Sequence, residues 1–228
     1  MLQHRTIDNF YFGFRQSLTE LQLRTLTANF NPHPPGSMPA LGGRTGLTRV
    51  HLDGIGPIVV KHYRRGGWLR HLNRRHYLKL AKNRARREFE LQHMAADAGV
   101  NVPPAVAYAY RGRLFYRAWL ITREIQQPLS LFRLSQEDEE RTAAVMTSVA
   151  DQISLLIKNG IWHVDLHPGN VVVDPAGKVY LLDFDKGKIY PGNKQKLKRR
   201  YLKRWQRAVE KHKLPKILTA MLQDGLNR

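Results

Sequence analysis

The stretch that decides the fold runs His163-Val164-Asp165-Leu166-His167-Pro168-Gly169-Asn170, and Asp183-Phe184-Asp185 completes it thirteen residues further on. Asp165 and Asn170 stand five positions apart in a predicted loop. A short hairpin is expected to follow this loop and to deliver Asp183 to the same place. The stretch therefore predicts two carboxylates and one amide gathered where a hairpin begins and ends.

The hairpin itself is predicted from its composition. Val171-Val172-Val173 and Val179-Tyr180-Leu181-Leu182 are strand-like runs, and Asp174-Pro175-Ala176-Gly177 supplies the turn between them. The ordinary alternative is a buried hairpin flanked by surface acids. That alternative does not explain why the polar residues suited to metal or proton chemistry cluster at the strand ends.

Such an arrangement suits phosphoryl transfer from ATP. One carboxylate takes the proton of the acceptor hydroxyl, while an amide oxygen and a second carboxylate hold Mg²⁺ on the phosphates. The spacing of these residues therefore predicts a kinase.

Composition indicates a folded protein. A length of 228 residues suits one domain or two small lobes, and 42% hydrophobic residues are enough for a core. With no cysteine, disulfides and thiolate zinc sites are excluded. No apolar run approaches the ~18 residues that span a bilayer, and no signal-peptide core begins the chain. We expect a soluble protein in a reducing compartment.

The charge balance is unusual. Lys plus Arg total 38 against 18 Asp plus Glu, a formal net charge of +20. This excess predicts an anionic partner such as nucleic acid, acidic lipid or a highly charged small substrate. Two stretches concentrate it: Lys61–Arg87 has eleven Lys/Arg and no acid, and Lys186–Lys213 has twelve against Glu210 alone.

The second basic stretch predicts an amphipathic helix. Leu197, Tyr201, Trp205 and Ala208 recur at helical spacing, with basic residues around them. One interpretation packs this apolar stripe on the core and leaves the charges in water. The other places the helix on a membrane surface or on nucleic acid, with Leu197, Tyr201 and Trp205 inserted at the level of lipid headgroups.

The first half of the chain predicts the phosphate-binding side of the site. Gly43 and Gly46 precede the strand-like run 48–52, where glycines let backbone N–H groups approach a phosphate; an ordinary turn looks much the same. The run 58–63 carries Lys61 on the face opposite Ile58, and an edge lysine is the simpler alternative. A helix is predicted over 80–98, with Gly99 as its C-terminal stop and an apolar stripe of Leu91, Met94, Ala95 and Ala98. This helix places Glu88 on its inward side, where it can pair with Lys61.

Further elements complete a two-lobed pattern. Two strands are predicted at 114–116 and 118–122, and Thr122 to Ile125, including Glu124, forms a connector whose backbone would bind the adenine edge. A capping box at Ser135 and Asp138 should begin a long helix that Gly160 ends. The stripe of this helix is Val145, Val149, Ile153 and Leu156. The order of elements indicates an α+β fold with an N-terminal lobe over 1–125 and a C-terminal lobe over 126–228, around a cleft.

These residues and motifs resemble the lipopolysaccharide kinases of Gram-negative bacteria, in particular those acting on 3-deoxy-D-manno-octulosonic acid (Kdo). The resemblance runs from about Gly42 to Lys186, and its more specific markers are Lys61–Gly67, Leu120–Ile125 and Leu182–Lys186. It implies a protein-kinase-like fold, with one helix in the N-terminal antiparallel sheet and a reduced, mainly helical C-terminal lobe.

The resemblance also implies roles for single residues. Asp165 is similar to the catalytic base, and Asn170 and Asp183 to the Mg²⁺ ligands. Gly43 and Gly46 correspond to the phosphate loop, and Lys61 and Glu88 to the ion pair that anchors ATP. Arg64 and Arg65 are candidates for contacting anions of the substrate.

Departures from the protein-kinase pattern bear on the expected regulation and on the expected class of substrate. Val164 stands where protein kinases carry a loop arginine, Asp185 and Lys186 replace the usual glycine, and no Ala-Pro-Glu segment follows. Regulation by activation-loop phosphorylation and a protein substrate are therefore not expected.

The resemblance implies a Kdo-bearing lipid A precursor as substrate, on the cytoplasmic face of the bacterial inner membrane. An anionic membrane surface would account for the basic excess, since each Lys or Arg near it contributes ~1 kcal/mol. A kinase acting on heptose of the lipopolysaccharide core is the alternative within this class. A nucleic-acid-binding kinase-like protein would explain the charge equally well, but it has no need of the Asp, Asn, Lys and Glu set.

Overall fold

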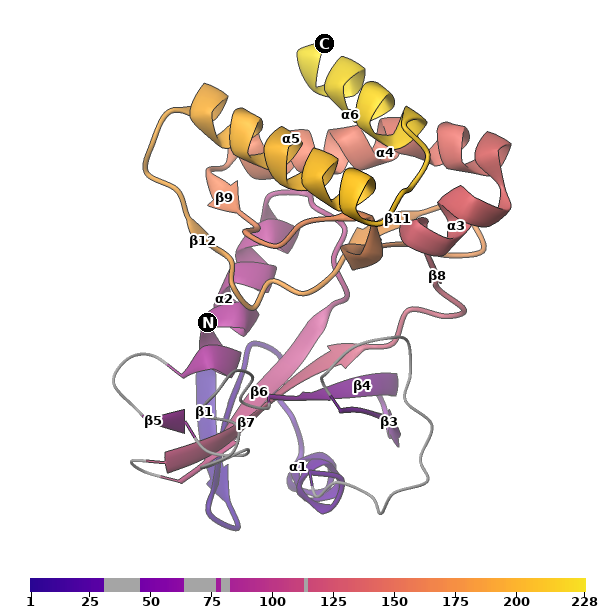
Figure 1. The fold of residues 1–228 in the computed structure, drawn as a ribbon. Coiled ribbons are helices and arrows are strands. Elements are labelled where there is room, and N and C mark those ends of the chain that lie inside the picture. Colours follow the sequence, from indigo (N-terminus) through magenta and orange to yellow (C-terminus); the bar gives the residue numbers. More distant parts are fainter. Residues whose placement is uncertain (31–45, 64–76, 79–82, 113–114) are drawn as a thin grey trace. The chain divides into compact units, whose positions relative to one another are not determined.

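The computed structural model describes residues 1–30, 46–63, 77–78, 83–112 and 115–228. The fold is mixed α+β and contains an antiparallel sheet (Figure 1). Two compact units share the chain: one comprises Met1–Glu90 and Pro104–Glu124, the other Leu91–Pro103 and Ile125–Arg228. The division falls inside helix α2, Arg84–Asp97.

The first unit is built on the sheet. Among the described residues its strands follow the order β1-β2-β6-β7-β4-β3, with β5 also paired to β7, and every pairing is antiparallel. The strand bounds are β1 Gln3–Ile7, β2 Phe10–Phe14, β3 Leu47–Leu52, β4 Gly56–His62, β5 Tyr77–Leu78, β6 Ala105–Arg111 and β7 Phe115–Arg123.

Strand β4 confirms the predicted alternation. Ile58 and Val60 are fully buried in the core, whereas Lys61 lies on the opposite face. Because β3 and β7 flank β4 on its two sides, Lys61 stands inside the sheet and is not an edge lysine. The two strands predicted at 114–116 and 118–122 were wrong: β7 is continuous through Arg117, and Leu114 lies outside the described residues.

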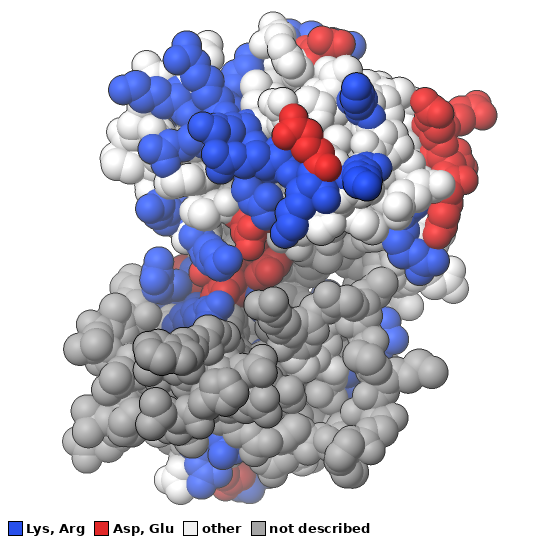
Figure 2. Space-filling model, in the orientation of Figure 1, with Lys and Arg blue, Asp and Glu red and all other residues white. Residues whose placement is uncertain are grey.

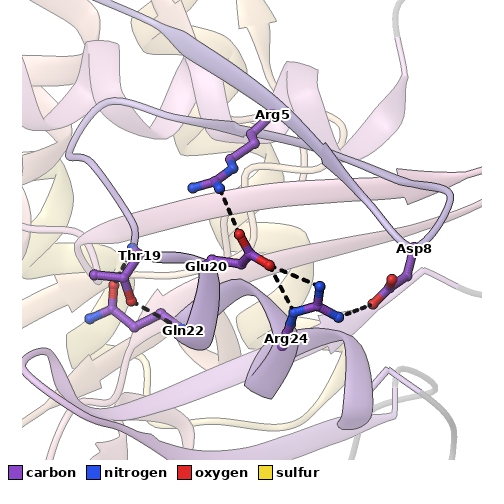
Figure 3. A network of polar contacts seen from close by, with 6 residues as sticks. All are labelled: Arg5, Asp8, Thr19, Glu20, Gln22 and Arg24. Atoms are coloured by element: carbon purple, nitrogen blue, oxygen red, sulfur yellow. Dashed lines mark hydrogen bonds and ion pairs between the residues drawn. The ribbon is translucent and has the colours of Figure 1, made fainter.

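A second helix in the first unit corrects the expectation of a single one. Helix α1, Glu20–Ala28, begins with a capping box in which Thr19 and Gln22 exchange side-chain to backbone hydrogen bonds. Glu20 in its first turn accepts from Arg5 at 3.1 Å and from Arg24 at 2.8 Å, so the helix is linked to β1 (Figure 3). Leu23 and Leu26 bury its apolar face, which explains why α1 covers the sheet core.

The second unit is mainly helical within the described residues. Its helices α4, α5 and α6 pack against one another (Figure 1). The helix bounds are α3 Leu131–Glu137, α4 Glu139–Lys158, α5 Lys194–Lys211 and α6 Ile217–Asn227. Short strands complete it: β8 Leu129–Ser130, β9 Ile161–Trp162, β10 Val171–Val173, β11 Val179–Leu181 and β12 Lys188–Ile189.

The start of the long helix α4 differs from the prediction. Ser135 lies inside the preceding helix α3 and donates to the carbonyl of Phe132, so it caps nothing. Asp138 is the N-cap, because its side chain accepts from the backbone N–H of Arg141. The predicted stripe of α4 is buried throughout, and Gly160 follows the helix with φ +64°.

Helix α2 ends as predicted at Gly99, which has φ +84°. The N–H of Val100 bonds the carbonyl of Ala95, and the N–H of Gly99 bonds that of Ala96, a Schellman motif. Met94 had been placed on the apolar stripe but is 43% exposed. Gln92 is buried instead and donates to the carbonyl of Pro103, which ties α2 to the chain leading into β6.

Helix α5 decides between the two interpretations of its apolar stripe. Leu197, Tyr201 and Trp205 are at most 2% exposed and belong to the core of the second unit. The Trp205 ring N–H also donates to the carbonyl of Leu218 in α6. Insertion of this stripe into a membrane was therefore wrong, because the stripe already packs against α4 and α6, and only the charged face of α5 meets solvent.

Candidate active site

In the first unit, Lys61 and Glu88 form an ion pair. The ammonium of Lys61 on β4 lies 2.9 Å from each carboxylate oxygen of Glu88 on α2. Glu88 is 3% exposed and Lys61 15%, so both charges are largely removed from water. Each charge compensates the burial of the other, as such sites require. Glu90, two residues on, instead pairs with Arg86 on its own helix.

Tyr63 is a third member of this cluster that the sequence prediction had not assigned. Its hydroxyl donates a short hydrogen bond to Glu88, and its ring lies 5.3 Å from the Lys61 ammonium. The guanidinium of Arg84 lies 5.4 Å from the same ring. Tyr63 therefore holds Glu88 from a second direction and contacts the lysine. The sequence feature that could have identified Tyr63 is its position two residues after Lys61, in the same strand-like run.

Only some of the other predicted site residues of this unit lie within the described residues. Gly46 lies just before β3, and its carbonyl accepts from the N–H of His62, whereas Gly43, Arg64 and Arg65 lie outside the described residues. Thr122 sits in β7 between Val59 and Ala105 of the neighbouring strands.

Glu124 follows β7 but is still tied to the sheet. Its N–H donates to the carbonyl of Pro57, and its carboxylate pairs with Arg49 at 2.6 Å. The N–H of Glu124 is therefore used within the sheet.

In the second unit, the hairpin brings Asn170 and Asp183 to one end. Val171 pairs with Leu181, and the next pair outward is joined by the Leu182 N–H donating to the Asn170 carbonyl at 2.9 Å. Asp183 is the residue that follows Leu182. The Asn170 side chain donates its NH₂ to the backbone carbonyl of Asp165 at 3.0 Å, so its amide oxygen is left as an acceptor.

Asp165 faces two cations. Its Oδ1 accepts from Arg204 of α5 at 2.6 Å, and its Oδ2 accepts from Lys186 at 3.2 Å. Burial raises the pKa of Asp165, but the hydrogen bonds from Arg204 and then Lys186 outweigh burial and bring that pKa down to about 2. Asp165 is therefore a carboxylate throughout the neutral range. The sequence analysis had considered the basic residues of this helix only as a surface for water, membrane or nucleic acid, and had not predicted this contact.

His163 orders the segment that carries Asp183. Its Nε2 donates to the carbonyl of Leu182 at 2.7 Å, and its ring meets the Phe184 ring edge-on at 4.6 Å. The backbone N–H of His163 donates to the hydroxyl of Tyr201 on α5. Between these contacts Asp183 takes φ +63°, which a non-glycine residue adopts only where its surroundings impose it.

The burial of His163 makes a prediction about stability. Burial lowers the pKa of this imidazole below its ordinary value near ~6.5. As pH falls through 6.5, the unfolded chain binds a proton that the folded chain does not, so the free energy of unfolding decreases. We expect the unfolding temperature of the wild type to fall between about pH 7 and about pH 5 more steeply than that of His163→Asn. Thermal melts across this range measure both slopes, and equal slopes would contradict the assignment.

Asn170 and Asp183 are the residues that could hold a metal. Amide and carboxylate oxygens are hard donors of the kind that Mg²⁺ prefers, and Mg²⁺ commonly takes few protein ligands with phosphates and waters supplying the rest. In the part of the chain that is described, no group of three or more His, Cys, Asp or Glu is arranged to hold a metal ion.

A largely buried ion pair between a strand lysine and a helix glutamate, with an Asp, Asn and Asp set around a hairpin, is the residue set of ATP-dependent phosphotransferases. The sequence from residue 41 to residue 222 matches the model of the lipopolysaccharide kinase (Kdo/WaaP) family. Because the match covers most of the chain, the protein belongs to this family.

Individual relatives agree with the family. The chain is 32% identical over 159 residues to a 3-deoxy-D-manno-octulosonic acid kinase of Vibrio vulnificus, covering 68% of this chain and 66% of the relative. Proteins of the same name from Xylella fastidiosa and Vibrio cholerae are each 32% identical, over 65% and 67% of this chain. The alignments span 66%, 59% and 65% of these three relatives, so the chain matches less than two thirds of the length of each.

Proposed function

We propose that this protein is an ATP-dependent kinase that phosphorylates a hydroxyl of Kdo on a lipid A precursor. The observation that carries the proposal is Asp165 held beside Asn170, at the hairpin end from which Asp183 follows, in a chain whose relatives are named Kdo kinases. We further propose a two-lobed, protein-kinase-like fold, with the lobes divided near residue 125.

Each residue then has a defined task. The Lys61 ammonium, fixed by Glu88, binds phosphate oxygens of ATP and leaves the γ-phosphoryl group in position. Asp165 accepts a hydrogen bond from the acceptor hydroxyl and takes its proton as the new bond to the γ-phosphorus forms and the bond from that phosphorus to the leaving ADP oxygen breaks. The low pKa of Asp165 does not prevent this proton transfer, because the acceptor hydroxyl loses its proton late in a loose transition state, when it has become strongly acidic. Mg²⁺ bound by Asn170 and Asp183 would neutralise charge on the phosphates.

An acceptor panel tests the proposal. Purified protein should release ADP from Mg-ATP at a rate that rises with the concentration of a Kdo-bearing lipid A precursor. With the same lipid lacking Kdo, ADP should be released only at the background rate. Release that requires a heptose-bearing core acceptor instead would point to the alternative within the family. Equal release with and without Kdo would contradict the proposal.

We also propose that the protein is peripheral on the cytoplasmic face of the bacterial inner membrane, where a lipid-borne acceptor is concentrated. None of the helices in the described ranges is long and apolar enough to cross a bilayer. Figure 2 shows Lys and Arg side chains gathered where Figure 1 draws α5. The exposed members of this surface, here called the basic face of α5, include Lys196, Arg199, Lys203 and Arg207.

Neutralising the basic face should weaken binding to anionic membranes. Changing Lys196, Arg199, Lys203 and Arg207 together to Gln should lower the affinity for anionic liposomes by at least about tenfold, because each cation contributes ~1 kcal/mol near such a surface. Co-sedimentation at low and high salt measures this. A control variant removes four charges elsewhere, at Arg87, Arg117, Lys216 and Arg228. Equal loss in both variants would show that the face has no special role.

A further inference from the structure

Two cations from different segments converge on Asp165. Arg204 reaches it from the middle of α5, with Nε at 3.2 Å and a terminal nitrogen at 2.6 Å from the same oxygen, Oδ1. Lys186 reaches Oδ2 from the segment that follows Asp183. The three side chains together carry one net positive charge, since two cations meet one carboxylate.

Both cations keep capacity for another anion. The side chain of Arg204 is 34% exposed and that of Lys186 is 63% exposed. Among the described residues, Asp165 is the only hydrogen-bond acceptor that either of them contacts. A guanidinium has five N–H donors and an ammonium has three, so most of these donors point to no acceptor in the described chain.

The pair is not needed to hold α5 in place. Leu197, Tyr201 and Trp205 already anchor this helix in the core of the second unit. Partly exposed ion pairs contribute little to folding stability. A role in binding accounts better for two exposed cations beside the proposed catalytic base.

We propose that Arg204 and Lys186 form a binding site for a carboxylate of the acceptor, and so select an acidic sugar over a neutral one. This inference rests on the proposed function, which supplies a sugar acid as acceptor. The carboxylate of such an acid is ionised at neutral pH. It would match the single net positive charge of the cluster, and an arginine fork is the side chain best suited to carboxylate geometry.

The site also explains how the acceptor meets its base. A carboxylate that binds the remaining donors of Arg204 and Lys186 shares these two cations with Asp165. The hydrogen bonds that these cations donate to Asp165 then loosen as the acceptor enters, and the carboxylate of Asp165 becomes available to the acceptor hydroxyl. Acceptor binding and release of Asp165 are thereby coupled through Arg204.

Binding of free Kdo and of its methyl ester tests this site without requiring phosphoryl transfer. The ester keeps every hydroxyl and removes the negative charge. Titrations followed by NMR should show that wild type binds the acid at least about tenfold more tightly than the ester, the usual effect of a charged hydrogen bond. Arg204→Gln and Lys186→Gln should each reduce this preference to about twofold or less. Lys211→Gln, which removes an exposed cation from the same helix, should keep it.

The outcomes separate the inference from the proposed function. Equal affinity of wild type for acid and ester, or an unchanged preference in Arg204→Gln, overturns the carboxylate site even if wild type phosphorylates the lipid acceptor. A preference for the acid that depends on Arg204 supports the carboxylate site, whether or not phosphate is transferred. Failure to transfer phosphate would contradict only the proposed function. Arg204→Lys serves as the folded comparison, because it keeps the charge and should retain part of the preference.

Discussion

Asp165→Asn is expected to lower the rate of phosphoryl transfer by ~10²–10⁴-fold, the usual cost of losing a positioned general base. Asparagine keeps the shape of the side chain but removes the charge that orients and deprotonates the acceptor hydroxyl. Nucleotide affinity should stay close to that of the wild type, because Asp165 is not among the residues proposed to hold the phosphates or the metal. Single-turnover rates and nucleotide titrations measure the two effects separately.

Two comparison variants sharpen this experiment. Asp183→Ala should weaken the binding of Mg-ATP itself, because it removes a proposed metal ligand. Asp151→Asn changes an exposed carboxylate on α4 and should leave both quantities unaltered. A near-wild-type rate for Asp165→Asn would contradict the assignment of Asp165 as the base.

Breaking the Lys61–Glu88 pair should have the second large effect. Lys61→Met and Glu88→Gln are each expected to lower kcat/KM by about a hundredfold or more, since the lysine must be both present and held to position the triphosphate. The double variant should lose little beyond either single one, because residues of one network couple strongly. A complete double-mutant cycle measures the coupling, and additive losses would indicate that the two side chains act independently.

Stability has to be followed in the same variants. Glu88 is almost fully buried, and removing Lys61 leaves its carboxylate with Tyr63 as a remaining hydrogen-bond donor. Loss of one partner of a buried pair costs roughly 3–5 kcal/mol of folding free energy. Glu88→Gln in combination with Lys61→Met removes both charges and should recover part of that loss. Rates should therefore be normalised to the folded fraction.

Sequence periodicity was sufficient where a segment carries its own signal. The β10–β11 hairpin, the alternation along β4 and the stop of α2 at Gly99 are local patterns, and all three are present. The contact between Lys61 and Glu88 was also predictable, because one residue lies on a strand face and the other on the buried side of the next helix.

Other features depend on tertiary contacts that no local sequence pattern predicts. Strand β6 alternates alanine and tyrosine, and alanine has low strand propensity, so its place beside β7 comes from packing. Helix α1 was not predicted, because it is short and its apolar face is narrow. The burial of the α5 stripe, and with it the approach of Arg204 to Asp165, follows from the presence of α6, which the sequence analysis had not predicted.

The measurement that tests the central claim most directly is mass spectrometry of the Kdo-bearing lipid A precursor after incubation with the protein and Mg-ATP. A gain in mass of one or more phosphates is predicted, carried by fragments that contain Kdo and strongly reduced at the same incubation time when Asp165→Asn replaces the wild type. An unmodified lipid, or phosphate found only on fragments without Kdo, would contradict the account.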